Sequence, residues 1–451
     1  MPLCSYQVAE LGAHARRRCL LAAVALSTAC ADSPTSPDTR FIASDDRPEP
    51  LLVSFPSTCP SNVTALTGVL PDGALFEFCV PPNPVSLLLY AHGYTQAASP
   101  LAIVDDSVPT GAGTWRRVSE IVTSLGFAFG TTSYPHVGLN GPEAVASLLL
   151  LKQAFTSAVG PLPPGAKTYV AGVSEGGLVA ALAAERPTGE FQGVLSTCGP
   201  VGDLQAQLNY FGDFRVLFDY FFPQVLGPAW TNNADYGAGD RARVAANWSF
   251  YQAQVLAALK ARPLAAAQLI NTSRAPIDPL DPTSVGETVV GLLWYNIFAT
   301  DDAVSRTGGR PYDNRNRYYT GSFNDAWLNY RVKRFTADPA ALATIASAFQ
   351  TTGRLQIPVV TDHTLLDPIV KASQEQLYAS KVALAGQSAR LSQLSVPRYG
   401  HCAFTVPELQ FALGVLVLKT AGVSLALASR NEQVMAPSFG AFAALGRPFA
   451  R

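Results

Sequence analysis

Tyr169-Val-Ala-Gly-Val-Ser-Glu-Gly-Gly177 is the stretch that decides the fold of this chain. It predicts an apolar strand that ends in a glycine-rich turn with Ser174 at its apex. The next residues, Leu178 to Glu185, are small and apolar and predict a helix. A turn this sharp brings neighbouring segments of backbone close together. Gly172 and Gly176 allow that approach because a glycine has no Cβ to clash. This G-x-S-x-G pattern between a strand and a helix predicts that the Ser174 hydroxyl is exposed at the end of a sheet strand.

The composition is that of a well-buried globular protein. Of the 451 residues, 48% are hydrophobic and only 14% are charged, which excludes a disordered or coiled chain. The formal net charge is −1, and the one basic block is Arg16-Arg17-Arg18. Because nothing else supplies the positive surface that a phosphate backbone needs, no nucleic-acid partner is expected.

The first 29 residues predict a signal peptide that is not part of the fold. Arg16-Arg17-Arg18 precedes an apolar segment that is too short to span a bilayer as a helix. Small residues then precede Cys30, and the whole resembles a bacterial lipoprotein signal. The resemblance implies that Cys30 becomes the acylated first residue and could anchor the protein to a membrane.

Simple secretion is the alternative to lipidation. Ala29-Cys30-Ala31 also fits an ordinary A-x-A cleavage site, which would release a soluble protein without Cys30. Both kinds of processing predict an exported protein, either a cell-envelope lipoprotein or a secreted or periplasmic one. Residues 30–50 are rich in Pro, Ser and Asp and are expected to form a polar tether.

Export changes what the cysteines predict. Beyond the leader, the chain has Cys59, Cys79, Cys198 and Cys402. An even number in an oxidising compartment predicts two disulfides, in one of three possible pairings. Strand-like runs at 51–55 and 74–78 on the two sides of a turn favour Cys59–Cys79, which leaves Cys198–Cys402. Four buried free thiols are the alternative.

From about residue 85 the chain alternates strand-like and helix-like segments. Continuous apolar runs, typical of buried parallel strands, occur at 85–91 and 127–133. Further strands are expected at 167–173 and 191–197. A helix is expected at 144–159, and another follows Ser174. This alternation predicts an α/β fold with a doubly wound, mostly parallel sheet.

The pattern changes between residues 199 and 353. Helix-like segments with many aromatic residues replace the strand-like runs, which resume at 355–361 and are followed by a last helix at 406–419. We therefore expect a core made of residues 51–198 and 354–451. Residues 199–353 would form a helical cap, inserted between late strands and placed over the strand ends. A purely structural helical layer is the alternative.

Ser174 has candidate partners late in the chain. A serine hydroxyl is a weak nucleophile and needs a general base, usually a histidine held by a carboxylate. His401 lies between a short strand-like run and the last helix, and Asp367 follows the strand-like run at 357–361. The chain order of Ser174, Asp367 and His401 resembles that of the α/β-hydrolase fold. The resemblance implies a Ser–His–Asp triad. Asp362 and, less well, Asp203 are the other candidates for the acid.

The segment His92-Gly93-Tyr94 follows an apolar strand and resembles the oxyanion loop of the same family. The resemblance implies that the backbone N–H groups of Tyr94 and Glu175 face the developing oxyanion. His92 would then shape the loop through hydrogen bonds rather than act as a catalyst.

A cysteine directly after the histidine, as in His401-Cys402, is similar to the pattern of tannase and feruloyl-esterase relatives. In those proteins the partner cysteine directly precedes the serine, whereas here that position is Val173. The resemblance therefore extends to only one of the two cysteines.

No motif for a metal or a nucleotide is present. The chain has no H-E-x-x-H, no C-x-x-C and no P-loop, so neither a metal nor a cofactor is expected.

The sequence as a whole predicts an exported serine hydrolase that cleaves carboxylic esters. The substrate is expected to be a small molecule with an apolar or aromatic part. A prolyl-oligopeptidase-like peptidase is one alternative, and a non-catalytic surface lipoprotein on a hydrolase scaffold is the other.

Overall fold

The structure, a computed structural model, describes residues 50–226 and 238–423, which belong to one compact unit, Pro48–Arg451. The expected signal peptide, Cys30 and nearly all of the expected tether lie outside the described residues, as do residues 424–451. Within the described ranges, no helix has the length and apolar character needed to span a membrane.

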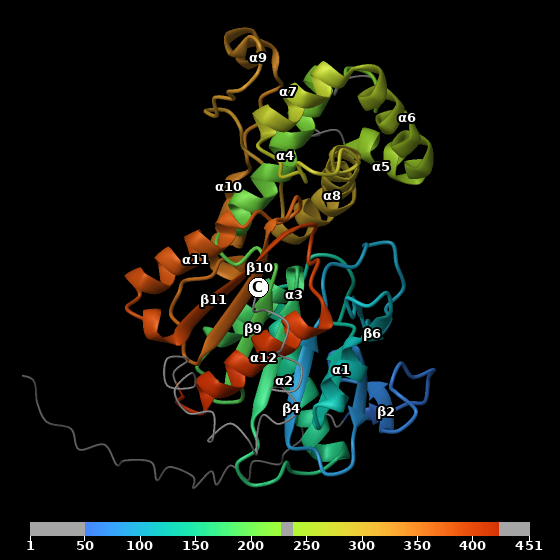
Figure 1. Cartoon of the computed structure of the whole chain (residues 1–451), viewed down its shortest axis with the longest axis vertical. Helices are drawn as coiled ribbons and strands as arrows, with labels where there is room; N and C mark the ends of the chain where they lie inside the picture. The colour runs from blue at the N-terminus through green and yellow to red at the C-terminus, as the bar shows by residue number, and fades with distance from the viewer. Residues whose placement is uncertain (1–49, 227–237, 424–451) are drawn as a thin grey trace, which may run out of the picture. The chain divides into compact units, whose positions relative to one another are not determined.

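The centre of the fold is a nine-stranded sheet with the order β1-β2-β3-β7-β4-β8-β9-β10-β11 (Figure 1). Its strands are β1 (Leu51–Leu52), β2 (Thr64–Val69), β3 (Leu75–Val80), β4 (Ser86–Ala91), β7 (Phe127–Thr132), β8 (Thr168–Val173), β9 (Gly193–Thr197), β10 (Val359–Leu366) and β11 (Leu391–Tyr399). The pairings from β7 to β11 are parallel, and the three at the β1 edge are antiparallel. The expected mostly parallel sheet is confirmed.

Helices cover both faces of the sheet. They are α1 (Val118–Ser124) and α12 (Val406–Thr420) on one face, and α2 (Pro142–Ala158) and α3 (Glu175–Ala184) on the other. Every residue of β4 is buried, and successive side chains alternate between the two faces. Leu87 and Leu89 pack in the cluster with α2 and α3, whereas Leu88 and Tyr90 pack with α1 and α12. A doubly covered sheet explains the continuous apolar runs.

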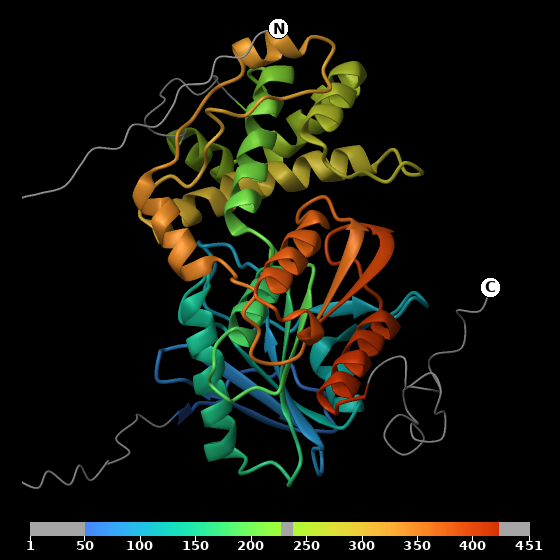
Figure 2. The same ribbon diagram turned by 90° about the vertical axis from the view of Figure 1, so that its left-hand side faces the viewer.

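The described residues between β9 and β10 contain helices and no strand, joined by loops such as residues 308–324. They form α4 (Leu204–Phe221), α5 (Ala238–Ala246), α6 (Trp248–Ala261), α7 (Pro263–Ser273), α8 (Ser284–Thr307), α9 (Asp325–Arg331), α10 (Pro339–Thr344) and the π-helical turn η1 (Ile345–Phe349). These helices lie next to one another and are not interleaved with the strands (Figure 2). The aromatic residues of the segment account for its separate core, which includes Phe211, Phe214, Phe218 and Tyr312.

The strand arrangement near Cys59 differs from the expectation. The turn at 70–74 joins β3 to β2, a strand the sequence analysis missed, while the run at 51–55 contributes only the two residues of β1. Gly68 interrupts the apolar pattern of β2 because β1 passes too close for a side chain: a Cβ there would lie 2.3 Å from the Leu51 carbonyl oxygen. The Cys59–Cys79 disulfide is present and ties β3 to the loop before β2.

Candidate active site

The serine turn has the geometry that its glycines predict. Ser174 lies between the end of β8 and the start of α3, and its backbone adopts φ 55° and ψ −121°, a strained combination for a residue with a side chain. Its N–H donates to the Thr197 carbonyl oxygen at 2.9 Å, and its own carbonyl oxygen accepts from the Gly177 N–H at 2.9 Å. These two hydrogen bonds hold the turn in its strained form.

Two glycines are required by close backbone contacts at this turn. A Cβ on Gly172 would lie 1.9 Å from the carbonyl oxygen of Gly176, and a Cβ on Gly176 would lie 1.9 Å from that of Ala91 at the end of β4. No side chain fits at these distances. The turn is thus wedged against β4, which brings Ser174 to the end of the sheet.

The structure brings Ser174, His401 and Asp367 together. The Ser174 Oγ is 2.8 Å from the His401 Nε2, and the His401 Nδ1 is 2.8 Å from the Asp367 Oδ2. Ser174 follows β8, Asp367 follows β10 and His401 follows β11. Because parallel strands end at the same edge of a sheet, residues separated by 227 positions meet there.

Asp367 is fully buried, and its carboxylate is held by several donors. Its Oδ1 accepts from the backbone N–H groups of Ile369 at 2.8 Å and Val370 at 3.0 Å. Its Oδ2 faces His401, and the Nε2 of a second histidine, His363, lies 3.7 Å from it. Buried carboxylates need such partners, and these fix the orientation of Asp367 toward His401.

The other two candidate acids lie elsewhere. Asp203 is the N-cap of α4, where its carboxylate accepts from the Ala206 N–H and the Gln350 side-chain amide. Asp362 is buried within β10, and its Oδ1 has no hydrogen-bond partner within the described ranges. Neither matches the hydrogen bond between Asp367 and His401.

Asp362 supplies a prediction about stability and pH. Burial raises the pKa of its carboxyl from 3.8 to about 7, with the charges of Glu408 and Glu375 adding to the effect. Between pH 4 and 7 the folded chain therefore keeps a proton that the unfolded chain has released, so the free energy of unfolding falls as pH rises through this window. In Asp362→Asn we expect this fall to be smaller by up to about 4 kcal/mol. Urea unfolding of both proteins from pH 4 to 8 measures it, and parallel curves would contradict the prediction.

The loop after β4 lies against Ser174. A Cβ on Gly93 would be 3.3 Å from the Ser174 Cβ, so this glycine allows the close approach. Glu175 is the first residue of α3, a position whose N–H has no acceptor within its own helix. The loop that carries Gly93 and Tyr94, and the first residue of α3, Glu175, both adjoin the serine.

His92 supports this loop from within the core. It is buried, its Nδ1 donates to the Gly93 carbonyl oxygen at 2.7 Å, and its ring stacks on Tyr134 with centroids 4.2 Å apart. Burial lowers the pKa of His92, which favours the neutral ring. These contacts match the loop-shaping interpretation.

The second disulfide reaches the site itself. Cys198, directly after β9, is bonded to Cys402, whose Sγ lies 3.5 Å from the His401 Nε2. The bridge ties the histidine loop to the neighbouring strand end. The expected Cys198–Cys402 pairing is confirmed, and the partner of Cys402 comes from the end of β9 and not from position 173 before the serine.

The sulfurs of both disulfides belong to groups of side chains that could in principle bind a metal ion. Among the described residues, two groups have metal-like spacing: Cys198 with His401 and Cys402, and Cys59 with Glu77 and Cys79. In both groups the two cysteines form a disulfide with each other. A disulfide has no thiolate to offer, so neither group is a metal site in this oxidised form.

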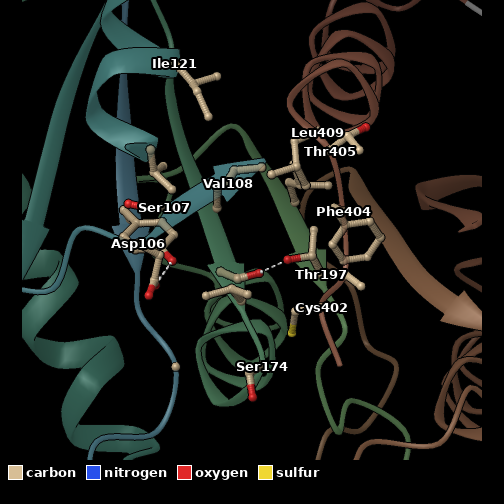
Figure 3. Close-up of a pocket in the computed structure, with 18 of the residues that line it drawn as sticks. Asp106, Ser107, Val108, Ile121, Ser174, Thr197, Cys402, Phe404, Thr405 and Leu409 are labelled. Atoms are coloured by element: carbon tan, nitrogen blue, oxygen red, sulfur yellow. Dashed lines mark hydrogen bonds between the residues drawn. The ribbon is translucent and has the colours of Figure 1, made fainter. Parts of the chain in front are cut away.

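A cavity of about 730 Å³ opens at Ser174 and His401. Figure 3 shows Ser174 at the bottom of the view, with Val108 and Ile121 above it and Leu409 and Phe404 to the right of Val108. The walls come from α1, from α12 and from the hairpin of β5 (Ser107–Pro109) and β6 (Trp115–Arg117). Most of the lining residues are apolar, and the volume is typical of a small-molecule site.

Tyr295 of α8 is a site residue that the sequence analysis did not single out. The centroid of its ring lies 6.3 Å from that of the His401 ring and 6.3 Å from that of the Tyr94 ring. The Tyr94 hydroxyl donates to the carbonyl oxygen of Phe298, which also belongs to α8. Tyr295 also lines the cavity. The aromatic richness of the insertion was the available signal, but it could not say which aromatic residue reaches the serine.

Neither a protein-family model nor a curated protein sequence matches this chain. Among solved structures, it is similar to an esterase from Pyrococcus furiosus (11% identity over 81% of this chain and 94% of the other, TM-score 0.39). It is also similar to proline iminopeptidase from Mycobacterium smegmatis (14% identity over 80% of this chain and 99% of the other, TM-score 0.39). A third similar structure is feruloyl esterase B from Aspergillus oryzae (15% identity over 84% of this chain and 86% of the other, TM-score 0.43). Identities this low say nothing about the reaction. By its own strand order and the positions of its serine, acid and histidine, the chain has the α/β-hydrolase fold.

Proposed function

We propose that this protein is a serine hydrolase that cleaves carboxylic esters. The observation that carries the proposal is the hydrogen-bonded series of Ser174, His401 and Asp367, with 2.8 Å at each step. The strained turn points the serine toward its base, and the base is oriented by a buried carboxylate. This is the arrangement that activates a serine hydroxyl.

The chemistry follows from the positions of these groups. The Ser174 Oγ attacks the ester carbonyl carbon while the His401 Nε2 takes its proton. Asp367 accepts from the Nδ1–H and stabilises the imidazolium. The oxyanion is held by the backbone N–H groups of Tyr94 and Glu175. His401 then gives the proton to the leaving alkoxide, and water, deprotonated by His401, releases the acid from Ser174.

The cavity favours an ester with an apolar or aromatic part over a peptide with a charged end. Among its described lining residues, Asp106 and Arg398 carry the charges. Asp106 accepts from the Tyr90 hydroxyl, and Arg398 pairs with Glu408. Arg398 is thus already neutralised by a carboxylate. The single carboxylate of Asp106 is not the acidic cluster that a peptidase would need to bind a charged amino end.

Export is part of the proposal. The leader predicts passage out of the cytoplasm, with Cys30 either lipidated or removed. Two disulfides in the described part of the chain support an oxidising compartment. Globomycin, which blocks lipoprotein signal cleavage, would raise the apparent mass of a lipidated form and leave a simply secreted form unchanged.

Hydrolysis of p-nitrophenyl esters from acetate to palmitate tests the reaction, beside aminoacyl p-nitroanilides as peptide-like substrates. We expect turnover of esters and little turnover of anilides, and the preferred chain length measures the cavity. Labelling by a fluorophosphonate, which reacts only with an activated serine, is run in parallel. A folded protein that turns over no substrate and is not labelled would instead be a binding protein on a hydrolase scaffold.

A narrowed cavity should select against long acyl groups. Val108 is 8% exposed and lines the cavity, so Val108→Phe fills part of it. Since each buried methylene contributes about 0.8 kcal/mol, excluding two or three of them lowers kcat/KM for octanoate about 10- to 100-fold, with acetate nearly unchanged. Val85→Phe, at an exposed position away from the cavity, is the matched control. An equal loss on both esters would show that the cavity does not hold the acyl chain.

A further inference from the structure

A second cavity, of about 370 Å³, lies within the helical insertion and beside the loop that follows Asp367. Its walls are α4, the end of α7, residues 317–320 and the start of α11 (Ser373–Leu384). Among the described residues, none lines both this cavity and the one at Ser174. Its volume is within the range of small-molecule sites and exceeds what a bare inorganic anion would fill.

The lining of this second cavity is positively charged. Its described charged residues are one carboxylate and three cations: Asp213, Arg274, Arg317 and Lys371. Asp213 is already engaged, because it accepts from the hydroxyls of Tyr312 at 3.0 Å and Tyr319 at 2.7 Å and pairs with Arg317. The lining therefore keeps a formal excess of two positive charges.

Lys371 and Arg274 have donors to spare. The Lys371 Nζ donates to the Ser273 carbonyl oxygen at 3.1 Å and lies 3.8 Å from the centre of the Tyr210 ring, which leaves part of its capacity of three N–H donors unused. To the residues that the structure describes, the Arg274 guanidinium makes one hydrogen bond, to the Thr320 hydroxyl at 3.3 Å. Burial lowers the pKa of Lys371 to about 8. The positive charges of Arg274 and Arg317 lower this pKa further, whereas the negative charge of Asp213 raises it. A bound anion would relieve that repulsion.

We propose that this cavity binds a small molecule through a phosphate or sulfate group held by Lys371 and Arg274. A phosphate monoester carries close to two negative charges at pH 7 and matches the excess charge, whereas a sulfate ester supplies one of the two. The fork of an arginine suits the oxygens of either group. The remaining volume accommodates an organic part, for which Tyr210, Tyr318 and Leu217 supply the surface.

The cavity shares its wall with the loop that positions the triad acid. Two of its lining residues hold the loop at Asp367–Lys371: the Tyr210 hydroxyl donates to the Pro368 carbonyl oxygen at 2.9 Å, and the Gln207 amide donates to that of Ile369 at 2.7 Å. The Ile369 N–H in turn donates to Asp367. If the proposed function holds, a ligand on Lys371 acts on the loop that orients Asp367, and its binding changes the reactivity of Ser174.

Calorimetric titration with inorganic phosphate, sulfate and glycerol phosphate tests the site, at a constant ionic strength set with sodium chloride. We expect saturable binding, at least tenfold weaker in Lys371→Met and in Arg274→Gln. Lys260→Met, at an exposed position on α6, should bind as the wild type does. Arg274 is exposed, so its variant should fold even if the Lys371 variant does not.

Absence of saturable binding, or binding that both site variants retain, overturns the site. If glycerol phosphate binds at least as tightly as inorganic phosphate, the cavity accepts an organic part on the anion. If glycerol phosphate binds more weakly or not at all, the claim that the cavity holds an organic part is overturned. The rate of fluorophosphonate labelling with and without saturating ligand tests the link to Asp367, and an unchanged rate overturns it. A protein that is never labelled contradicts the proposed hydrolase function alone, because the titration needs no reactive serine.

Discussion

Replacing Ser174 by alanine should lower kcat for p-nitrophenyl esters by about 10⁵- to 10⁶-fold, as large an effect as removal of the whole triad would have. The alanine keeps the turn but removes the oxygen that attacks the carbonyl carbon. Residual hydrolysis would come only from substrate binding and the oxyanion donors, which act on a water molecule. The steady-state rate measures the loss, and fluorophosphonate labelling should disappear with it.

Ser380→Ala is the matched control, because Ser380 is an exposed serine of α11 whose hydroxyl donates only to the Gln376 carbonyl oxygen. It should retain full activity and labelling. A Ser174→Ala protein that folds and keeps more than about one per cent of the wild-type rate would require another nucleophile.

Replacing Asp367 by asparagine should lower kcat about 10⁴-fold while the fold is kept. The carboxylate only accepts hydrogen bonds, so it holds the His401 ring with its proton on Nδ1 and leaves Nε2 free to accept from Ser174. An asparagine can present its NH₂ group to Nδ1. This favours the opposite tautomer, in which Nε2 carries the proton and cannot serve as the base.

Asp362→Asn is the matched control for Asp367→Asn, because it removes a carboxylate from β10 without removing the acceptor for His401. Asp362 is equally buried and only five positions away, but the structure does not place it on His401. Its variant should keep kcat within about threefold of the wild type, since no reacting group depends on it. If instead Asp362→Asn abolishes turnover and Asp367→Asn does not, the assignment of the acid is wrong.

Much of the site could be predicted from local sequence because it depends on backbone sterics. Gly172 and Gly176 are needed where carbonyl oxygens come within 1.9 Å of a Cβ position, and that need is visible in the pattern around Ser174. Continuous apolar runs likewise indicated parallel strands covered on both faces.

Other features depend on contacts between distant segments and leave weak local signals. β2 was missed because Gly68 interrupts its pattern, and that glycine reflects the passage of β1 and not a property of β2 itself. The choice between Asp362 and Asp367 depends on where β10 ends relative to His401, a difference of a few residues that hydrophobicity does not encode. Tyr295 is one aromatic residue among many in the insertion, and only packing brings it to the histidine.

The sequence by itself determined the alternation of strands and helices, the serine turn and the candidates for its partners, His401 with Asp367 or Asp362, because each depends on periodicity, on glycine sterics or on a short motif. Only the tertiary structure decided which carboxylate meets His401, how the space between α1 and α12 forms a cavity, and where Lys371 and Arg274 converge. Those features arise where side chains far apart in the chain share one volume, and such distances are set by packing and not by neighbours in sequence.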